Sequence, residues 1–353
     1  MNLKLINLDD TDDVLFWNNF KIINKKYLDI YNEEKYINLY TSENGKAFII
    51  CITEGKNFWL NCFIKTKITN YENILDQNYY DIETPYGYGG PIFNNINSSF
   101  LKKAEETYNE WCIENNIICE FIRFHPLKNN HINCKYPKVI FERDNKCTIL
   151  SNIKTDLSNF NPKVRNKIRK VQKNEVLIEI SKSREVFENF KKLYCQNMMK
   201  LKADDFYLFD EMYFDQIFNL IVENGFLVSA IDKNKNFLGA SIFLYFDSYM
   251  HYHLSAITNK AKVPGINNAL LLAAYNHGKK LGIEICNLGG GISKSDSDSL
   301  LEFKTSMSNK STKFYIGYKI YNKDLYNKIM KDFKIKNPKK YLKNSNKILG
   351  YRY

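Results

Sequence analysis

The stretch "FLVSAIDKNKNFLGASIFLYFDSYMHYHLSAI" (226–257) decides the fold of this chain. It contains three runs of apolar, β-branched and aromatic residues, and the polar "DKNKN" (232–236) joins the first two as a hairpin connection. A Pro/Gly loop follows, then a helix expected at 267–281 and a strand-like run at 283–288. Strands joined by a hairpin are antiparallel, whereas a strand–helix–strand step returns as a right-handed parallel crossover. The segment therefore predicts a mixed sheet.

The same order of elements occurs once earlier in the chain. The expected elements there are strands at 46–52, 58–64 and 79–83, a Pro/Gly loop at 84–91, a helix at 98–115 and a strand at 117–124. Residue identity between the two halves is low, so the shared order is the evidence for an internal duplication. We predict an α+β fold (an α/β mixed sheet) in two tandem, pseudo-duplicated domains at 1–150 and 151–325, followed by a basic tail at 326–353.

The composition is that of a globular protein with a large core. The chain has 353 residues, of which 44% are hydrophobic, and this is enough for two domains. It has no apolar run long enough to span a membrane, and its early acidic residues are unlike a signal peptide. The eight cysteines form no Cys-x-x-Cys pair and lie mostly in apolar runs, which indicates reduced core residues and no zinc site. We expect a cytoplasmic protein.

The positive charge is concentrated at the C-terminal end. The net charge is +12, and residues 323–353 hold ten Lys/Arg and two Asp, a net of +8. Only six residues of the whole chain are Arg, the residue on which nucleic-acid readers rely for bidentate contacts. The pattern predicts a solvated basic tail. A peripheral contact with acidic membrane, or with RNA, is the alternative.

A basic helix is expected between the two halves. In "NPKVRNKIRKVQK" (161–173), Asn161 is a candidate N-cap and proline takes the first helical position. Arg165 and Arg169 stand one turn apart beside the apolar stripe. They are candidates for a pyrophosphate clamp, and a solvated helix face is the alternative interpretation.

Several motifs together resemble a known group of enzymes. They are "YYDIETPYGYGGP" (79–91), "FIRFHP" (121–126), "KVRNKIRK" (163–170), "MMKLKADDFYLF" (198–209) and "NLGGG…LLEFKTSM" (287–307). Over about residues 25–322 the chain resembles the double-domain branch of the GNAT superfamily, the Fem-type aminoacyltransferases and their acetyltransferase-like relatives. The resemblance implies two GNAT-like domains, with the acceptor on the side of the first.

The resemblance also implies an N-acyltransferase of cell-envelope or surface-polysaccharide synthesis. The donor it implies is an acyl-CoA co-substrate. The acceptor is an amino group on a nucleotide-activated amino sugar or a similar precursor. The alternative is a Fem-type enzyme that moves an aminoacyl group from tRNA to a peptidoglycan precursor. Two other classes stay open: a non-catalytic RNA-binding protein, and a glycosyltransferase using the Asp-x-Asp of Asp296 and Asp298, residues that otherwise cap a helix.

Two departures from the family pattern affect the site. His125-Pro126 stands where Fem-type enzymes commonly carry Asp-Pro, so His125 is a candidate base or shapes the acceptor site. The phosphate loop of the family has only a degenerate counterpart beginning at Lys262. We expect Gly265, Asn267 and Asn268 to open a helix whose free N–H groups meet donor phosphate, and an ordinary Pro-Gly turn is the alternative.

The glycine loop and a lysine complete the predicted donor side. Gly289, Gly290 and Gly291 lack the residues of a P-loop or a dinucleotide fingerprint. They allow close approach of a ligand to the backbone. The family motif implies that Lys304 pairs with phosphate or polarises the acyl carbonyl, whereas a solvated helix lysine is the alternative.

Aromatic and histidine side chains complete the candidate set. Tyr86 and Tyr88, with Gly89 and Gly90, are expected to form an acceptor-site lip for a sugar or base. His251 and His253 alternate on one strand and are expected to line the catalytic cleft or to form a buried pair, without a metal. The predicted catalytic residues are Lys304, His125 and His253. The predicted donor- or acceptor-binding residues are Tyr86, Tyr88, Gly89, Gly90, Arg165, Arg169, His251, Gly265, Asn267, Asn268, Gly289, Gly290 and Gly291.

Overall fold

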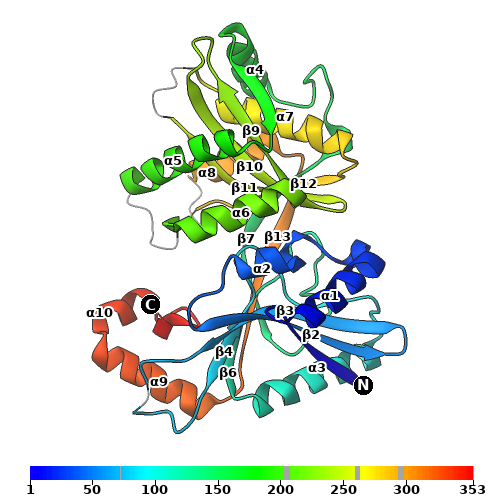
Figure 1. Ribbon diagram of the computed structural model, residues 1–353, viewed down its shortest axis with the longest axis vertical. Coiled ribbons are helices and arrows are strands. Elements are labelled where there is room, and N and C mark those ends of the chain that lie inside the picture. The colour runs from blue at the N-terminus through cyan, green and yellow to red at the C-terminus, as the bar shows by residue number, and fades with distance from the viewer. Residues whose placement is uncertain (72, 202–206, 259–262, 293–297, 353) are drawn as a thin grey trace. The chain divides into compact units, whose positions relative to one another are not determined.

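The computed structural model describes residues 1–71, 73–201, 207–258, 263–292 and 298–352. The chain forms two compact units, one of residues 1–142 and 313–353 and the other of residues 143–312 (Figure 1). Each unit is described by itself below. Two strands, β7 (Lys138–Ile149) and β13 (Lys310–Ile320), begin in one unit and end in the other.

The first unit is a mixed sheet with helices on it. Its strands are β1 (Asn2–Asn7), β2 (Gly45–Glu54), β3 (Asn57–Lys67), β4 (Tyr80–Glu83), β5 (Ile92–Phe93) and β6 (Ile117–Arg123). Its helices are α1 (Thr11–Asn24), α2 (Glu34–Asn38), α3 (Ser98–Glu114), α9 (Lys323–Lys336) and α10 (Pro338–Asn344), with short 3₁₀ turns η1 (Lys25–Tyr27), η2 (Ile30–Asn32) and η5 (Gly350–Arg352). Strands β1 to β4 are antiparallel neighbours, β4 runs parallel to β6 across the crossover helix α3, and β6 pairs with β13.

The second unit repeats this plan. Its strands are β8 (Leu177–Ser181), β9 (Gly225–Ile231), β10 (Phe237–Phe246), β11 (Tyr249–Ile257) and β12 (Ile285–Gly289). Its helices are α4 (Pro162–Lys173), α5 (Arg184–Leu201), α6 (Glu211–Asn224), α7 (Ile266–Lys280) and α8 (Ser299–Met307), after the 3₁₀ turn η3 (Leu150–Asn152). Strands β8 to β11 are antiparallel neighbours, β11 runs parallel to β12 across α7, and β12 pairs with β7.

In each unit, the second of the two parallel strands pairs on its other side with a strand that follows the opposite half of the sequence. β7 follows the first half in sequence, yet its C-terminal end pairs with β12 of the second unit, with Ile149 opposite Ile285. β13 follows the second half, yet its C-terminal end pairs with β6 of the first unit, with Ile320 opposite Cys119. The predicted mixed sheet with a repeated order of elements is confirmed.

Apolar faces on helices and strands explain why these segments fold. On α3 the buried residues recur at helical spacing and pack on Phe63 and Ile82 of the sheet; they include Phe100, Leu101, Ala104, Tyr108 and Trp111. In the second unit, α4 and α7 bury Ile168 and Leu270 against the sheet in a separate cluster. Each fully buried side chain of this size contributes about 1.5–3 kcal/mol.

The C-terminal segment is not the separate tail that the sequence analysis predicted. Leu325, Tyr326, Ile329 and Phe333 of α9 are buried in a cluster with Ile118 of β6. Residues 313–325, expected in the second domain, also belong to the first unit. The correction has a simple physical reason, because an apolar stripe at helical spacing lies within the run of lysines and buries one face of α9. Among the described residues, no helix combines the length and the apolar composition needed to cross a bilayer.

Candidate functional site

The parallel ladder of the second unit is short. β11 pairs with β12 only from Tyr249 opposite Ile285 to His251 opposite Asn287, although β11 continues to Ile257. Beyond His251 the two strands part. Backbone groups at such a point need partners other than a neighbouring strand, and a ligand amide or a carbonyl can supply them.

In the first unit the corresponding parallel pair stays closed. Thr84 donates its backbone N–H to Phe121 O at 3.1 Å, just beyond the last residue of β4. Gly89 forms a further parallel bridge with Phe124. The opening between parallel strands is therefore a feature of the second unit.

A bulge in β11 aims a histidine out of the regular ladder. Ile242 pairs with Leu254 and Phe243 pairs with Tyr252, so His253 is the extra residue. Its Nε2 lies 3.1 Å from the hydroxyl of Tyr213 on α6. Burial, and to a smaller extent the neighbouring His251, lower the pKa of His253 to about 3. Such a weak base favours a hydrogen-bonding role for His253 over removal of a proton from an ammonium group.

Hydrogen bonds fix the tautomer of His251. The amide oxygen Oδ1 of Asn287 accepts the backbone N–H of Gly289 at 3.1 Å, which directs Nδ2 the other way. Nδ2 lies 3.3 Å from Nδ1 of His251, which is buried. Nδ1 therefore accepts, and the hydrogen of the neutral imidazole sits on Nε2.

Lys304 lies under the glycine loop. It is carried by α8, is only 8% exposed, and donates from Nζ to Gly290 O at 2.6 Å. Burial lowers the pKa of Lys304 to about 8; Asp298 opposes this shift and Arg143 adds to it. The lysine is thus not the solvated side chain of the alternative interpretation. A cation buried inside a protein acts strongly on any anion that reaches it.

The loop itself is packed tightly. Gly289 has φ +73°, a left-handed conformation that favours glycine. A Cβ at Gly290 would come within 2.7 Å of Cδ of Arg143, and one at Gly291 would come within 2.4 Å of the carboxylate of Asp298. Arg143 also donates to Gly291 O at 2.8 Å. Side chains larger than hydrogen would push the loop away from Lys304.

Asp298 has a structural role in this arrangement. Its Oδ1 accepts the backbone N–H of Leu301 at 2.9 Å and so caps α8. This agrees with the capping interpretation of the Ser/Asp stretch. Asp296 and Lys262 lie outside the described residues.

The N-terminus of α7 has features of an anion site. Gly265 is its N-cap with φ +98° and makes no side-chain cap. Asn268, in the first turn, is 2% exposed, and its Nδ2 has no hydrogen-bond partner among the residues that the structure describes. Asn267 Oδ1 lies 3.5 Å from the Ser255 hydroxyl of β11. The N–H groups in the first turn of a helix and a buried amide donor together suit a phosphate.

The two arginines of α4 differ in exposure, and their predicted role as a pyrophosphate clamp stays a prediction. Arg165 is half-buried and donates from Nη1 to Phe160 O at 2.7 Å, whereas Arg169 is exposed. The middle of α4 nevertheless lies at the N-terminus of α7, because a Cβ at Gly265 would come within 2.6 Å of Cβ of Lys167. The expected N-cap is confirmed, with Asn161 Oδ1 accepting the N–H of Val164 at 2.9 Å.

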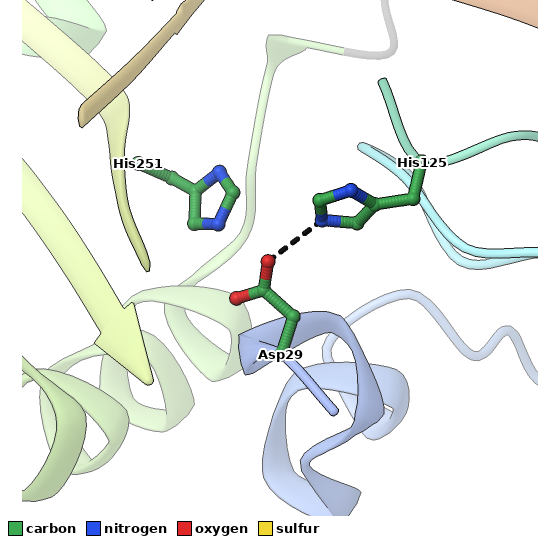
Figure 2. Close-up of side chains that lie close together, drawn as sticks. All are labelled: Asp29, His125 and His251. Atoms are coloured by element: carbon green, nitrogen blue, oxygen red, sulfur yellow. Dashed lines mark hydrogen bonds and ion pairs between the residues drawn. The ribbon is translucent and has the colours of Figure 1, made fainter. Parts of the chain in front are cut away.

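In the first unit His125 forms a buried pair with Asp29. Nε2 of His125 lies 2.6 Å from Oδ2 of Asp29 (Figure 2). Nδ1 accepts the backbone N–H groups of Leu127 and Lys128, each at 3.2 Å. An accepting Nδ1 places the hydrogen on Nε2, which donates to the carboxylate. This geometry favours a positioning role for His125 rather than that of a base. His251, also drawn in Figure 2, belongs to the second unit.

The tyrosine loop of the first unit is rigid and partly exposed. The ring of Tyr88 packs on Tyr31 and Phe314 with centroids 5.4 and 5.2 Å apart, and the hydroxyl of Tyr36 donates to Tyr86 O at 2.9 Å. Asn130 donates to Gly89 O at 2.8 Å, and Gly90 has φ +78° against Phe124. Tyr86 and Tyr88 stay half-exposed.

Several residues of these sites were not predicted from sequence. Asn287 could have been found, since it precedes the glycine loop and polar side chains at a strand end often serve a site. Arg143, Tyr213 and Asp29 had no local signal, because only tertiary packing brings them to the loop, to His253 and to His125.

Comparisons with known proteins identify the fold. Neither a protein-family model nor a curated protein sequence matches the chain. The structure is similar to that of FemX, with a TM-score of 0.66 and 15% identity, over 84% of this chain and 93% of FemX. It is also similar to L-PGS from Bacillus licheniformis, with a TM-score of 0.58 and 12% identity, over 88% of this chain and 92% of the other.

A third similar structure is a tandem GNAT protein from the clavulanic acid biosynthesis pathway, solved without AcCoA. Its TM-score is 0.50 with 6% identity, and the match covers 91% of this chain and 99% of that protein. This chain shares its fold with FemX, with L-PGS and with this tandem GNAT protein. The predicted resemblance and fold class are confirmed at the level of structure.

Proposed function

We propose that this protein is an N-acyltransferase whose transfer site lies in the second unit. The observation that carries the proposal is the buried ammonium group of Lys304 beneath the glycine loop, next to the point where β11 and β12 part. A chain of hydrogen bonds links the two features through Gly289, Asn287 and His251. A buried cation beside open backbone groups suits a carbonyl that gains negative charge.

The reaction needs few groups. The acceptor amine attacks the acyl carbonyl, the C–N bond forms, the carbonyl oxygen becomes an oxyanion, and the bond to the leaving group then breaks. Lys304 stabilises the oxyanion or a phosphate of the substrate. His251 lies at the point where β11 and β12 part, and stays a predicted binding residue. The hydrogen bond between the Tyr213 hydroxyl and Nε2 of His253 holds the imidazole ring of His253 in position. The attacking amine gives up one proton and the departing leaving group takes one up, so that an amide and a neutral leaving group result. His125 stays a predicted base for the amine proton only if its bond to Asp29 opens.

We propose an acyl-CoA as donor. The uncapped N-terminus of α7 and the buried amide of Asn268 support it, because both suit a pyrophosphate. Arg165 and Arg169 stay candidate phosphate contacts on the neighbouring helix α4. The alternative donor is aminoacyl-tRNA, which the resemblance to Fem-type enzymes implies.

The proposed acceptor is an amino group of a nucleotide-activated amino sugar. The half-exposed rings of Tyr86 and Tyr88 support this choice, since aromatic faces stack on sugars and bases. A peptidoglycan precursor is the alternative acceptor. Both place the protein in envelope or surface-polysaccharide synthesis.

A binding screen followed by product analysis tests the proposal. The full chain is heated with acetyl-CoA, charged tRNA or UDP-amino sugars, and a ligand that binds the native state raises the melting temperature. Mass spectrometry then looks for an acylated amino sugar in mixtures that contain both substrates. An acetylated product supports the proposal, and a product formed only with charged tRNA supports the alternative. If no donor or acceptor binds and no donor–acceptor pair gives a product, both the proposed function and its alternative are wrong.

A further inference from the structure

The outer surface of α9, of α10 and of the segment just after α10 in the first unit is strongly basic, and nothing in the proposed transfer reaction uses it. The exposed lysines are Lys323, Lys328, Lys331, Lys334, Lys336, Lys339, Lys340, Lys343 and Lys347. The two acidic residues of the segment hardly offset them. Asp332 pairs with Lys336 at 2.8 Å, and Asp324 is the other. The inner face of α9 is packed in a hydrophobic core cluster, so the backbone that carries the lysines of its outer face is held in place.

Two large apolar side chains project from the same surface. Ile335 at the end of α9 is 70% exposed, and Leu342 on α10 is 82% exposed. Beside Ile335 an open hollow of about 360 Å³ is lined by Lys328, Lys331 and Asp332 of α9, together with Asn73 and Ile74. The hollow is thus flanked by two ammonium groups and by one apolar side chain that points outward.

We propose that this basic surface docks on an anionic lipid bilayer. The ammonium groups of Lys328 and Lys331 attract lipid phosphate at the hollow, while Ile335 and Leu342 enter the headgroup region. The features favour a bilayer over RNA. Single-stranded RNA is bound by exposed aromatic rings and by arginine, whereas Tyr326, Phe333 and Tyr351 of this segment are buried. The one arginine of the segment, Arg352, pairs with Asp81.

Vesicle binding tests the proposal. The full chain is centrifuged with vesicles of phosphatidylcholine alone, or with vesicles in which about one third of the lipid is phosphatidylglycerol. We expect binding to the anionic vesicles that weakens as salt rises, and little binding to the neutral ones. The double variant Lys328→Gln/Lys331→Gln should bind about thirtyfold more weakly, since each lysine near the surface contributes about 1 kcal/mol.

Matched variants separate this surface from a general effect of charge. Lys102→Gln/Lys103→Gln removes the same charge from α3, which packs in a different core cluster of the first unit, and should bind like the wild type. Ile335→Ser/Leu342→Ser should weaken binding with little change in its salt dependence. Equal loss with the α3 variant, equal binding to both vesicle types, or tighter binding to oligouridylate than to anionic vesicles overturns the proposal. Melting temperatures confirm that each variant is folded.

Discussion

At the scale of single residues, burial gives Lys304 its chemical character. An exposed lysine would be charged at every pH of interest, but burial lowers the pKa of Lys304 to about 8. The folded state therefore disfavours the ammonium form relative to the unfolded chain. Because the folded-state pKa of Lys304 is lowered, its contribution to the stability of the fold is full above its ordinary pKa. This contribution is lost as the pH falls through about 8. A buried ammonium group that lowers the stability of the fold is consistent with a functional role for Lys304.

The pH dependence of transfer reports the working form of Lys304. If the ammonium group stabilises negative charge, the rate falls as pH rises through about 8. In Lys304→Arg the cation persists to much higher pH, so the alkaline limb should move upward with the same acceptor. The measurement is kcat against pH for both proteins. A wild-type rate that rises through pH 8 would assign Lys304 as a neutral base instead.

Asn268 provides a second test at this scale. Its buried Nδ2 lacks a partner among the described residues, and an unsatisfied buried donor costs about 1–3 kcal/mol. Asn268→Leu should therefore keep or raise the melting temperature of the free protein. The same change should weaken acetyl-CoA binding about tenfold, measured by calorimetry. A lower melting temperature with unchanged affinity would mean that the amide serves the fold alone.

At the scale of elements, the C-terminal turn is held by buried charge. Arg352 pairs with Asp81 and Glu83 of β4, and Tyr351 donates its hydroxyl to Asp81, which is fully buried. Arg123 of β6 also pairs with Glu83, at 3.0 Å. The end of the chain is thereby fastened to the two parallel strands of the first unit.

Removal of Arg352 should destabilise the first unit. Arg352→Met leaves Asp81 buried without its cation, and such losses cost about 3–5 kcal/mol. Denaturant unfolding of the full chain measures the change. The matched control is Arg184→Met, which removes exposed pairs with Glu188 and Asp215 and should cost less than about 1 kcal/mol. Similar small losses in both variants would show that the turn is not held by this pair.

Glu120 makes the stability of the same unit depend on pH. It lies inside the sheet on β6, where burial raises its pKa to about 7 despite hydrogen bonds from three tyrosine hydroxyls and from Asn61. Because its folded pKa is raised, its stabilising contribution is full below the ordinary value of 4.5 and is lost as pH rises through about 7.

The corresponding variant is Glu120→Gln. It should flatten the dependence of unfolding free energy on pH between about 5 and 8, while the wild type loses about 2–3 kcal/mol over that range. Denaturant melts at several pH values provide the measurement. The prediction fails if wild type and variant keep parallel pH profiles.

At the scale of the whole molecule, the sequence predicts regular elements well and long-range partners poorly. Strand β2, expected at 46–52, runs from Gly45 to Glu54, and α4 starts after Asn161 as its cap predicts. These follow from local periodicity and capping. The exchange of β7 and β13 could not be predicted, because any strand edge offers the same backbone groups to any partner.

Some residues of the candidate site could be predicted from the sequence, and others could not. The glycine loop and Lys304 carried signals in the sequence, and the structure places them in contact. Asp29 could not be expected beside His125, since 96 residues separate them. The bulge at His253 depends on pairing between β10 and β11 that alternation along one strand does not specify.

The most direct test of the central claim is the rate of acyl transfer in Lys304→Met. Product is measured by mass spectrometry with acetyl-CoA and the amino-sugar acceptor found in the screen, beside melting temperature. The matched control is Lys279→Met, which removes another lysine of the second unit that donates to a backbone carbonyl, Ile153 O at 2.9 Å. We predict a loss of about a hundred- to a thousandfold in kcat for Lys304→Met alone, with an unchanged or higher melting temperature. Equal rates in wild type, Lys304→Met and Lys279→Met would contradict a transfer site at this loop.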